Sequence, residues 1–244
     1  TKCKLTLIDR FGCTITDSVM YTAIATKAEF TMTQLDDNGI EISSSDTELS
    51  DQAPMNVRFT NKSKRGADFV WFFGDSLVKK DEDYIYTSDF NLQPEHTYFF
   101  TKKNGGYTYT AKLTSTSSYG CKDSVTATIT LDPSEIEFPN VFSPNNGDDI
   151  NNKFKLDPEK FKSIRTFKIT IYNRVGQLMH EYEGDINDWD GWDGKVRGGS
   201  QDASEGTYFF VVEVTGWDGV TYNNEKLNSK GNSYFGFIGL YRDK

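Results

Sequence analysis

The sequence from Phe138 to Phe154 reads FPNVFSPNNGDDINNKF. Pro139 and Pro144 keep the backbone extended around a short apolar run. The Asn, Gly and Asp residues that follow tolerate tight turns and positive φ angles. This pattern predicts a strand that leads into a shaped loop and is anchored again at Phe154. The sequence before this stretch differs from the sequence after it. Repeated β-sandwich patterns precede the stretch, and one domain of another kind follows it.

The composition limits the possible functions. The chain has 244 residues, enough for two domains with hydrophobic cores, and its 18 Phe and 13 Tyr favour β-structure. A net charge of −9 argues against a nucleic-acid partner, because phosphate binding needs concentrated Lys and Arg. No run reaches the roughly 18 apolar residues of a membrane span. Because the chain opens at Thr1 inside a strand-like pattern, we expect it to be part of a longer protein.

A unit near the N-terminus occurs a second time farther along the chain. Both copies contain an aromatic-Gly-Cys turn, then Asp-Ser-Val and an alternating strand. The turns are Phe11–Cys13 and Tyr119–Cys121, so the period is 121 − 13 = 108 residues. A period of this length indicates tandem domains rather than a solenoid. The sequence therefore predicts that residues 1–25 are the closing hairpin of a preceding domain whose body lies outside this chain.

Short alternating strands recur between the two copies, with turn residues between them. The alternating positions are Val57, Phe59, Phe69, Trp71, Phe73, Tyr84, Tyr86, Tyr98, Phe100, Tyr107, Tyr109, Ala111 and Leu113. No segment has a sustained period of 3.6 residues, so we expect very little helix. The polar stretch Asp36–Gln52 is expected to be a mobile surface loop. The pattern predicts an antiparallel β-sandwich.

Three motifs of this region occur in a specific order. They are Trp71–Asp75, His96–Tyr98 and the alternating stretch Gly106–Leu113. Together they resemble the polycystic-kidney-disease (PKD) domain, although a Ser replaces the last Gly of that family's Trp-x-Phe-Gly-Asp-Gly motif. The resemblance implies an immunoglobulin-like extracellular β-sandwich over residues 26–133 that serves as a spacer or stalk. The histidine of the second motif is then expected to make a structural hydrogen bond.

The C-terminal part also alternates between apolar and polar residues. Strands are expected at Phe167–Tyr172, Gln177–Tyr182, Tyr208–Val214 and Tyr234–Arg242. The third of these is apolar on both faces apart from one Glu, which is typical of a central strand. Asp157–Glu159 carries an N-cap residue and a first-turn proline, which favour one short helical turn.

This part contains a series of short motifs. They are Pro139–Asn145, Gly147–Asp148, Ile150–Asn151, Phe154, Ile171–Arg174, Gly176, Trp192–Gly194, Gly206–Phe210 and Gly236–Ile238. In this order they resemble the type B C-terminal sorting domain of the Bacteroidota type IX secretion system, also called the gliding-motility-associated C-terminal domain. The resemblance covers residues 134–244 and leaves a linker of about Asp132–Glu135. The expected fold is all-β, with tandem immunoglobulin-like antiparallel sandwiches.

The resemblance also implies a partner and a location. The folded terminal domain would be bound by the type IX translocon or its outer-membrane barrel partner proteins, and would carry the upstream stalk through the periplasm to the cell surface. The chain is then the C-terminal part of a surface adhesin whose own ligand is unknown. The residues expected to contact the secretion partner are Asn145, Asp148, Arg174, Trp189, Trp192 and Phe237.

A basic cluster stands out in this acidic chain. Its members are Lys160, Lys162, Arg165, Lys168 and Arg174. Two interpretations are open: the cluster is a solvated strand face, or it complements an acidic surface on the secretion machinery and steers the encounter.

The loop after Pro144 has oxygen-bearing side chains at short spacing, as Ca²⁺ requires. The candidate ligands are Asn145, Asp148, Asp149 and Asn151. The alternative is a loop of Asx-turns that satisfies its own backbone amides, and the scarcity of carboxylates favours this alternative.

The run Asp188–Gly194 contains two tryptophans within four residues. If exposed, they form a sugar platform or a docking face; if buried, they anchor an irregular loop. The alternative function follows from the first case: a carbohydrate-binding accessory region of a secreted surface enzyme, with Trp189, Trp192 and Trp217 as stacking platforms.

The cysteines and histidines support little chemistry. Cys3 and Cys13 flank a predicted turn, so either they form a disulfide with Cys121 left free, or all three are reduced thiols. With no Cys-x-x-Cys motif, structural zinc is not expected. Neither His96 nor His180 has a nearby nucleophile in a suitable context, so we expect no catalytic residues and no enzyme activity.

Overall fold

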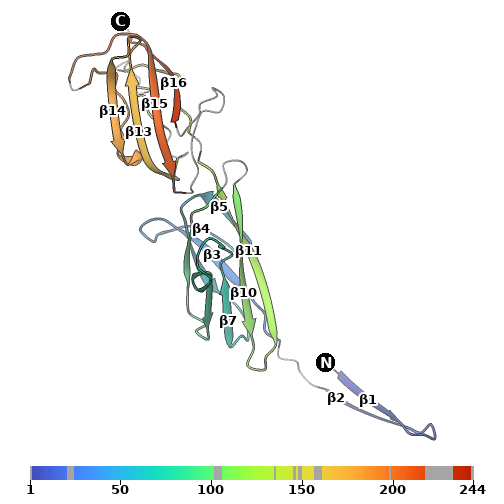
Figure 1. The fold of residues 1–244 in the computed structure, drawn as a ribbon. Helices are drawn as coiled ribbons and strands as arrows, with labels where there is room; N and C mark the ends of the chain where they lie inside the picture. Colours follow the sequence, from blue (N-terminus) through green and yellow to red (C-terminus); the bar gives the residue numbers. More distant parts are fainter. Residues whose placement is uncertain are drawn as a thin grey trace.

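The computed structural model describes most of the chain. The described residues are 2–20, 25–101, 106–134, 136–144, 147, 150–156, 161–197, 199–217 and 233–242. They form an N-terminal hairpin, a central β-sandwich and a C-terminal β-domain (Figure 1). The prediction of an all-β fold with very little helix is confirmed. Within this described part, no helix has the length and hydropathy needed to cross a membrane.

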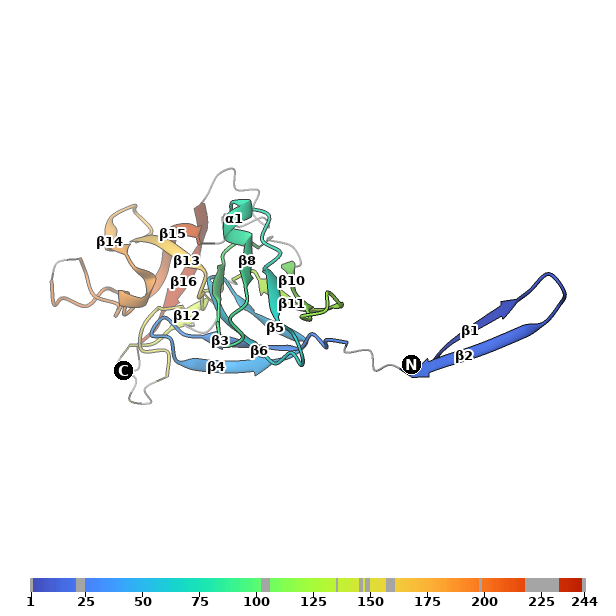
Figure 2. The ribbon, with the colours of Figure 1, turned by 90° about the horizontal axis from the view of Figure 1, so that it is seen from below.

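The hairpin consists of β1 (Lys2–Ile8) and β2 (Thr14–Met20), which pair antiparallel. The Asp9 carboxylate closes its turn by accepting hydrogen bonds from the amides of Phe11 (2.8 Å) and Cys13 (2.9 Å). The hairpin projects away from the rest of the molecule in two perpendicular views (Figures 1 and 2). Its apolar side chains are consequently exposed.

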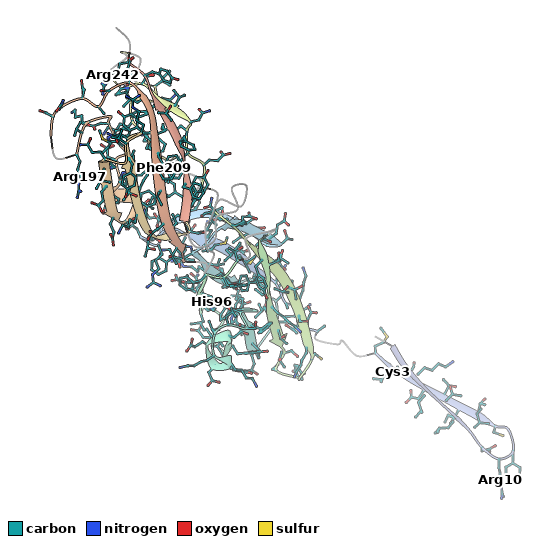
Figure 3. All side chains as sticks on the ribbon, turned by 45° about the horizontal axis from the view of Figure 1, so that its top comes forward. Cys3, Arg10, His96, Arg197, Phe209 and Arg242 are labelled. Atoms are coloured by element: carbon teal, nitrogen blue, oxygen red, sulfur yellow. The ribbon has the colours of Figure 1, made fainter. Side chains whose placement is uncertain are left out.

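Of the two alternatives for the cysteines, the Cys3–Cys13 disulfide is wrong. Cys3 lies opposite Val19 at the open end, whereas Cys13 lies opposite Asp9 beside the turn. Figure 3 labels Cys3 at one end of the hairpin and Arg10 at the other. Along the first strand, Cys3 and Asp9 are six residues apart. At roughly 3.4 Å per residue, Cys3 and Cys13 are therefore separated by about 20 Å. A disulfide needs Cα atoms within about 7 Å, and all three cysteines are free and exposed.

The central sandwich packs two sheets on one core. The first sheet has the order β5 (Glu48–Gln52), β11 (Lys122–Asp132), β10 (Tyr107–Thr116), β7 (Asp68–Phe72) and β8 (Tyr84–Thr87). The second has the order β4 (Glu41–Ser45), β3 (Phe30–Leu35), β6 (Met55–Asn61) and β9 (Glu95–Tyr98). A single helical turn, α1 (Lys80–Asp83), lies between β7 and β8. Alternating residues of both sheets fill the core, with the Phe30 and Trp71 rings 5.5 Å apart.

The expectation of a mobile loop at Asp36–Gln52 is wrong, because this stretch forms β4 and β5. Both are edge strands, for which a polar sequence is suitable since most side chains face water. Leu49 of β5 enters the core, and Ser50 donates a 2.8 Å hydrogen bond to Asp132 on β11. Backbone pairing therefore orders a segment whose composition suggested a loop.

The Trp71–Asp75 motif forms a structural turn. Gly74 has a φ of +77°, and the buried Asp75 carboxylate lies 3.3 Å from Nε2 of His96. The imidazole ring stacks on Phe73 at 4.8 Å. His96 thus has the structural role that was expected. Its ring nitrogen contacts Asp75 and its ring face stacks on Phe73, and both contacts stabilise this turn.

The C-terminal domain contains one described sheet. Its order is β12 (Val141–Phe142), β16 (Ser233–Leu240), β15 (Gly206–Gly216), β13 (Ile164–Tyr172) and β14 (Leu178–Gly184). The four predicted strands are confirmed, and β15 is central. The stretch Phe138–Phe154 contains β12. This strand pairs in parallel with β16, so the stretch belongs to this domain. The predicted helical turn at Asp157–Glu159 lies outside the described residues.

Irregular segments cover one face of this sheet. Phe154 and Trp192 form a backbone bridge with hydrogen bonds of 2.9 and 3.0 Å, and the short 3₁₀ helix η2 (Ile186–Asp188) packs beside them. Their side chains complete a core with the inward residues of β13 and β15. Within the described residues, the opposite face of the sheet has no such cover.

Hydrogen bonds and an ion pair join the sandwich to the terminal domain. The Ser134 hydroxyl accepts from the amide of Ser163 (3.0 Å) and donates to Gln52 (2.5 Å). Lys162 pairs with Asp51 at 3.1 Å. These contacts lie beside the short linker and favour restricted motion between the two domains.

Candidate functional site

The predicted calcium ligands are only partly described. Asn145, Asp148 and Asp149 lie outside the described residues, so the calcium site stays a prediction. Asn151 has a φ of +53°, and its carbonyl accepts a 2.9 Å hydrogen bond from the amide of Ser143. In the part of the chain that is described, no group of three or more His, Cys, Asp or Glu could hold a metal ion.

The indoles of Trp189 and Trp192 are buried, with exposed fractions of 8% and 1%. The Nε1 of Trp192 donates to the Lys195 carbonyl (2.9 Å), and that of Trp189 donates to Nε2 of His180 (3.2 Å). These indoles anchor the irregular layer, which corrects the prediction that they contact a secretion partner. Trp217 is 47% exposed, so the three indoles do not form a sugar platform and the carbohydrate alternative loses its basis.

His180 is a structural residue of the same layer. Its burial lowers the pKa of the imidazole, and the nearby Asp193 charge opposes this shift only partly. A neutral ring leaves Nε2 able to accept the hydrogen bond from Trp189. Burial and this hydrogen bond together favour packing over catalysis.

The outer face of the sheet carries exposed aromatic side chains. The register places Phe209 on β15 directly between Phe237 on β16 and Tyr172 on β13. Cross-strand partners point to the same side, so Tyr172, Phe209 and Phe237 form one surface, here named the aromatic face. The rings of Phe209 and Phe237 lie 5.5 Å apart, and Phe237 is 65% exposed. Figure 3 labels Phe209 on the terminal sheet.

An open groove lies at one end of the aromatic face. Its lining residues are Tyr172, Asn173, Arg174, Gly176, Thr207, Tyr208, Phe209 and Phe237. The turn between β13 and β14 supplies Arg174, and the Asn173 side chain orders that turn by accepting from the amides of Val175 (3.1 Å) and Gln177 (2.9 Å). The structure therefore brings together two of the predicted partner-contacting residues, Arg174 and Phe237.

Comparison with known families decides what this domain is. Residues 136–238 match the sequence model of the CHU_C type IX secretion signal domain. The terminal domain is a type IX secretion signal domain. Such a domain implies recognition by the secretion machinery and export to the cell surface or outside the cell. Domains of this family serve as non-catalytic signals.

The other basic residues of the signal domain lie away from the groove. At the other end of the sheet, Lys168 pairs with Glu183 at 2.9 Å, and the hydrogen bond that the ammonium donates to this carboxylate raises the pKa of the lysine. The guanidinium of Arg165 lies 4.9 Å from the Trp217 ring centroid. The predicted basic cluster is thus spread out and largely engaged in contacts within the chain; Lys160 lies outside the described residues.

Solved structures resemble this chain only loosely. A tetra-tandem repeat from the extending region of a large adhesion protein aligns over 98% of this chain and 81% of its own, at 11% identity and a TM-score of 0.25. SGBP-B of the Bacteroides ovatus mixed-linkage glucan utilization locus, in complex with a heptasaccharide, aligns over 80% of this chain and 42% of its own, at 13% identity and a TM-score of 0.22. Latent dimeric PorU from Porphyromonas gingivalis aligns over 99% of this chain and 24% of its own, at 12% identity and a TM-score of 0.26. Such superpositions carry no argument about function.

No curated protein matches the sequence.

Proposed function

We propose that this chain is the terminal stalk and sorting signal of a cell-surface adhesin, exported across the outer membrane when the type IX machinery binds its signal domain. The observation that carries the proposal is the family match over residues 136–238. Binding requires no chemistry on a substrate, in keeping with the structural roles of His96 and His180.

The central sandwich supports the stalk part of the proposal. Its PKD-like motif residues form the turn around Asp75, and its core is filled by large rings. The junction at Ser134 and Lys162 ties it to the signal domain. A packed module joined in this way can hold the preceding part of the protein at a fixed distance from the signal domain. It needs no ligand of its own to act as a spacer.

A reporter fusion tests the export function. We expect residues 134–244, fused to the C-terminus of a neutral reporter, to cause its secretion by a type IX-competent bacterium. A matched fusion carrying residues 26–133 should stay inside the cell, because it lacks the signal domain. Retention of both reporters would contradict the proposal, as would equal secretion of both.

The stalk proposal extends to the hairpin, which we take to be the closing hairpin of a further sandwich of the same type. Aligning Cys13 on Cys121 places Leu5 on Leu113, yet Leu5 is 62% exposed and Leu113 is fully buried. The register gathers Leu7 with its partner Ile15 on the same side as Leu5. One face of the hairpin is therefore apolar and uncovered, although its counterpart in the central sandwich faces a core.

The central sandwich indicates what would cover this face. There, β10 pairs antiparallel with β7, and β11 pairs in parallel with β5. Equivalent strands of a preceding sandwich would flank β1 and β2 in the same manner and bury their apolar side chains.

Hydrogen exchange tests the hairpin assignment. A two-stranded hairpin alone is marginally stable, so the amides of β1 and β2 should exchange rapidly in residues 1–244. In the full-length natural protein they should be protected at least about 100-fold more strongly, since a sandwich then covers them. The amides of β10 and β11 should be protected in both samples and serve as the control. Equally rapid exchange of β1 and β2 in both samples would refute the assignment.

A further inference from the structure

The aromatic face exposes ring surface to water on the outer side of the terminal sheet, where Phe209 and Phe237 lie side by side. The central sandwich also has outward-facing rings, those of Phe72, Tyr84 and Tyr86 on β7 and β8. Grouped exposed apolar side chains mark interaction surfaces in soluble domains. In the signal domain these rings adjoin a groove that Arg174 also lines.

The groove beside this face combines apolar walls with one positive charge. Among the described residues, Arg174 has no ion pair, and no carboxylate lines the groove. Arg174 also lines the neighbouring hollow, together with Asp202 and Glu205. The guanidinium of Arg242 lies 3.4 Å from Asp202, and the backbone amide of Arg242 donates a 2.9 Å hydrogen bond to Glu205. The groove itself is lined by aromatic and polar residues, with Arg174 as its charged member.

We propose that the aromatic face and Arg174 form the docking site for an extended segment of the secretion machinery that carries a large apolar side chain and a carboxylate. The apolar side chain would pack on Phe209 and Phe237, and the carboxylate would pair with Arg174, which can bind it through two parallel hydrogen bonds. This inference rests on the proposed function, because it names the surface and the partner chemistry of the same signal.

Two substitutions test the docking site in the fusion of residues 134–244 to the reporter. Phe237→Ser removes the exposed ring, and Arg174→Glu reverses the charge on an exposed turn. Each should lower secretion at least about tenfold, since truncated aromatic and Arg contacts dominate interface energies. The matched controls are Trp217→Ser, an exposed indole directly after β15, and Arg197→Glu, an exposed guanidinium that pairs with Glu181 at 2.7 Å and does not line the groove. Both controls should be secreted within about twofold of the parent.

The outcomes separate the two proposals. If the unmodified fusion is retained in the cell, the export function is wrong and the docking site with it. If the unmodified fusion and both groove variants are secreted equally, the export function holds and the docking site is overturned. Thermal unfolding of the purified variants checks their folding. Because Arg174 is exposed and has no ion pair among the described residues, full secretion of Arg174→Glu overturns the docking site even if Phe237→Ser fails to fold.

Discussion

Replacing Trp192 with alanine is expected to destabilise the signal domain by about 3–5 kcal/mol, the usual cost of deleting a buried tryptophan. The indole is 1% exposed and packs against Phe142 at 5.3 Å and Tyr208 at 4.9 Å. Its loss would leave a cavity between the sheet and the irregular layer, and would leave the Lys195 carbonyl without its 2.9 Å donor. Since domains of this size are stable by only about 5–15 kcal/mol, secretion of the fusion should fall as well.

The measurement for Trp192→Ala is urea unfolding of the purified chain, followed by the fluorescence and circular dichroism of the terminal domain. Trp217→Ala is the matched control, because this indole is half exposed and lies outside the core. It should cost less than about 1 kcal/mol. Similar losses for the two variants would contradict the anchoring role assigned to Trp192.

Gly74→Ala is expected to destabilise the central sandwich by about 2–4 kcal/mol. Two costs combine at this position. A φ of +77° is unfavourable for a residue with a Cβ, by roughly 1 kcal/mol. The new Cβ would also lie 2.4 Å from the carbonyl oxygen of Thr110, so β10 would have to shift, at a cost of about 1–3 kcal/mol.

Gly120→Ala separates these two costs. Gly120 has a φ of +80°, but no atom lies within 4 Å of the position that a new Cβ would take. It should therefore lose only the conformational part, about 1 kcal/mol. Hydrogen exchange of the β7 and β10 amides in the full chain gives the local stability of each variant. If the two alanines cost the same, the backbone contact at Thr110 would have no energetic role.

Strands with one buried face could be predicted from the sequence, as β6 and β13 show, because their apolar residues alternate. The edge strands β4 and β5 could not. Leu49 is the one buried apolar residue that they contribute to the core among the described residues. Their order comes from backbone hydrogen bonds, which every residue type except proline can donate, so composition alone pointed to a loop.

The candidate site could also be predicted only in part from the sequence. Family motifs pointed to Arg174 and Phe237 separately, but their proximity depends on the register of β13, β15 and β16, which spacing along the chain does not determine. Phe209 lies on a strand that was predicted to be apolar on both faces. Whether a second apolar face is covered or exposed depends on what packs against it, and only the fold shows this.

The tryptophans were ambiguous for a physical reason. A short Gly- and Asp-rich run places no constraint on which way its side chains point, so exposed and buried indoles were both compatible with it. The backbone bridge between Trp192 and Phe154, two residues far apart in the chain, turns the indole into the core. The two alternatives for Cys3 and Cys13 were open for a related reason, since spacing along the chain did not show that the turn pairs Cys13 with Asp9 and not with Cys3.

The most direct test of the export signal compares one fusion in two strains. The reporter carrying residues 134–244 is expressed in a bacterium with a functional type IX translocon and in the same strain without it, and the reporter is measured outside and inside the cells. We expect it at the cell surface or in the medium of the first strain, and at background level outside the second. Retention in the competent strain, or equal export by both strains, would contradict the assignment of this domain as the signal.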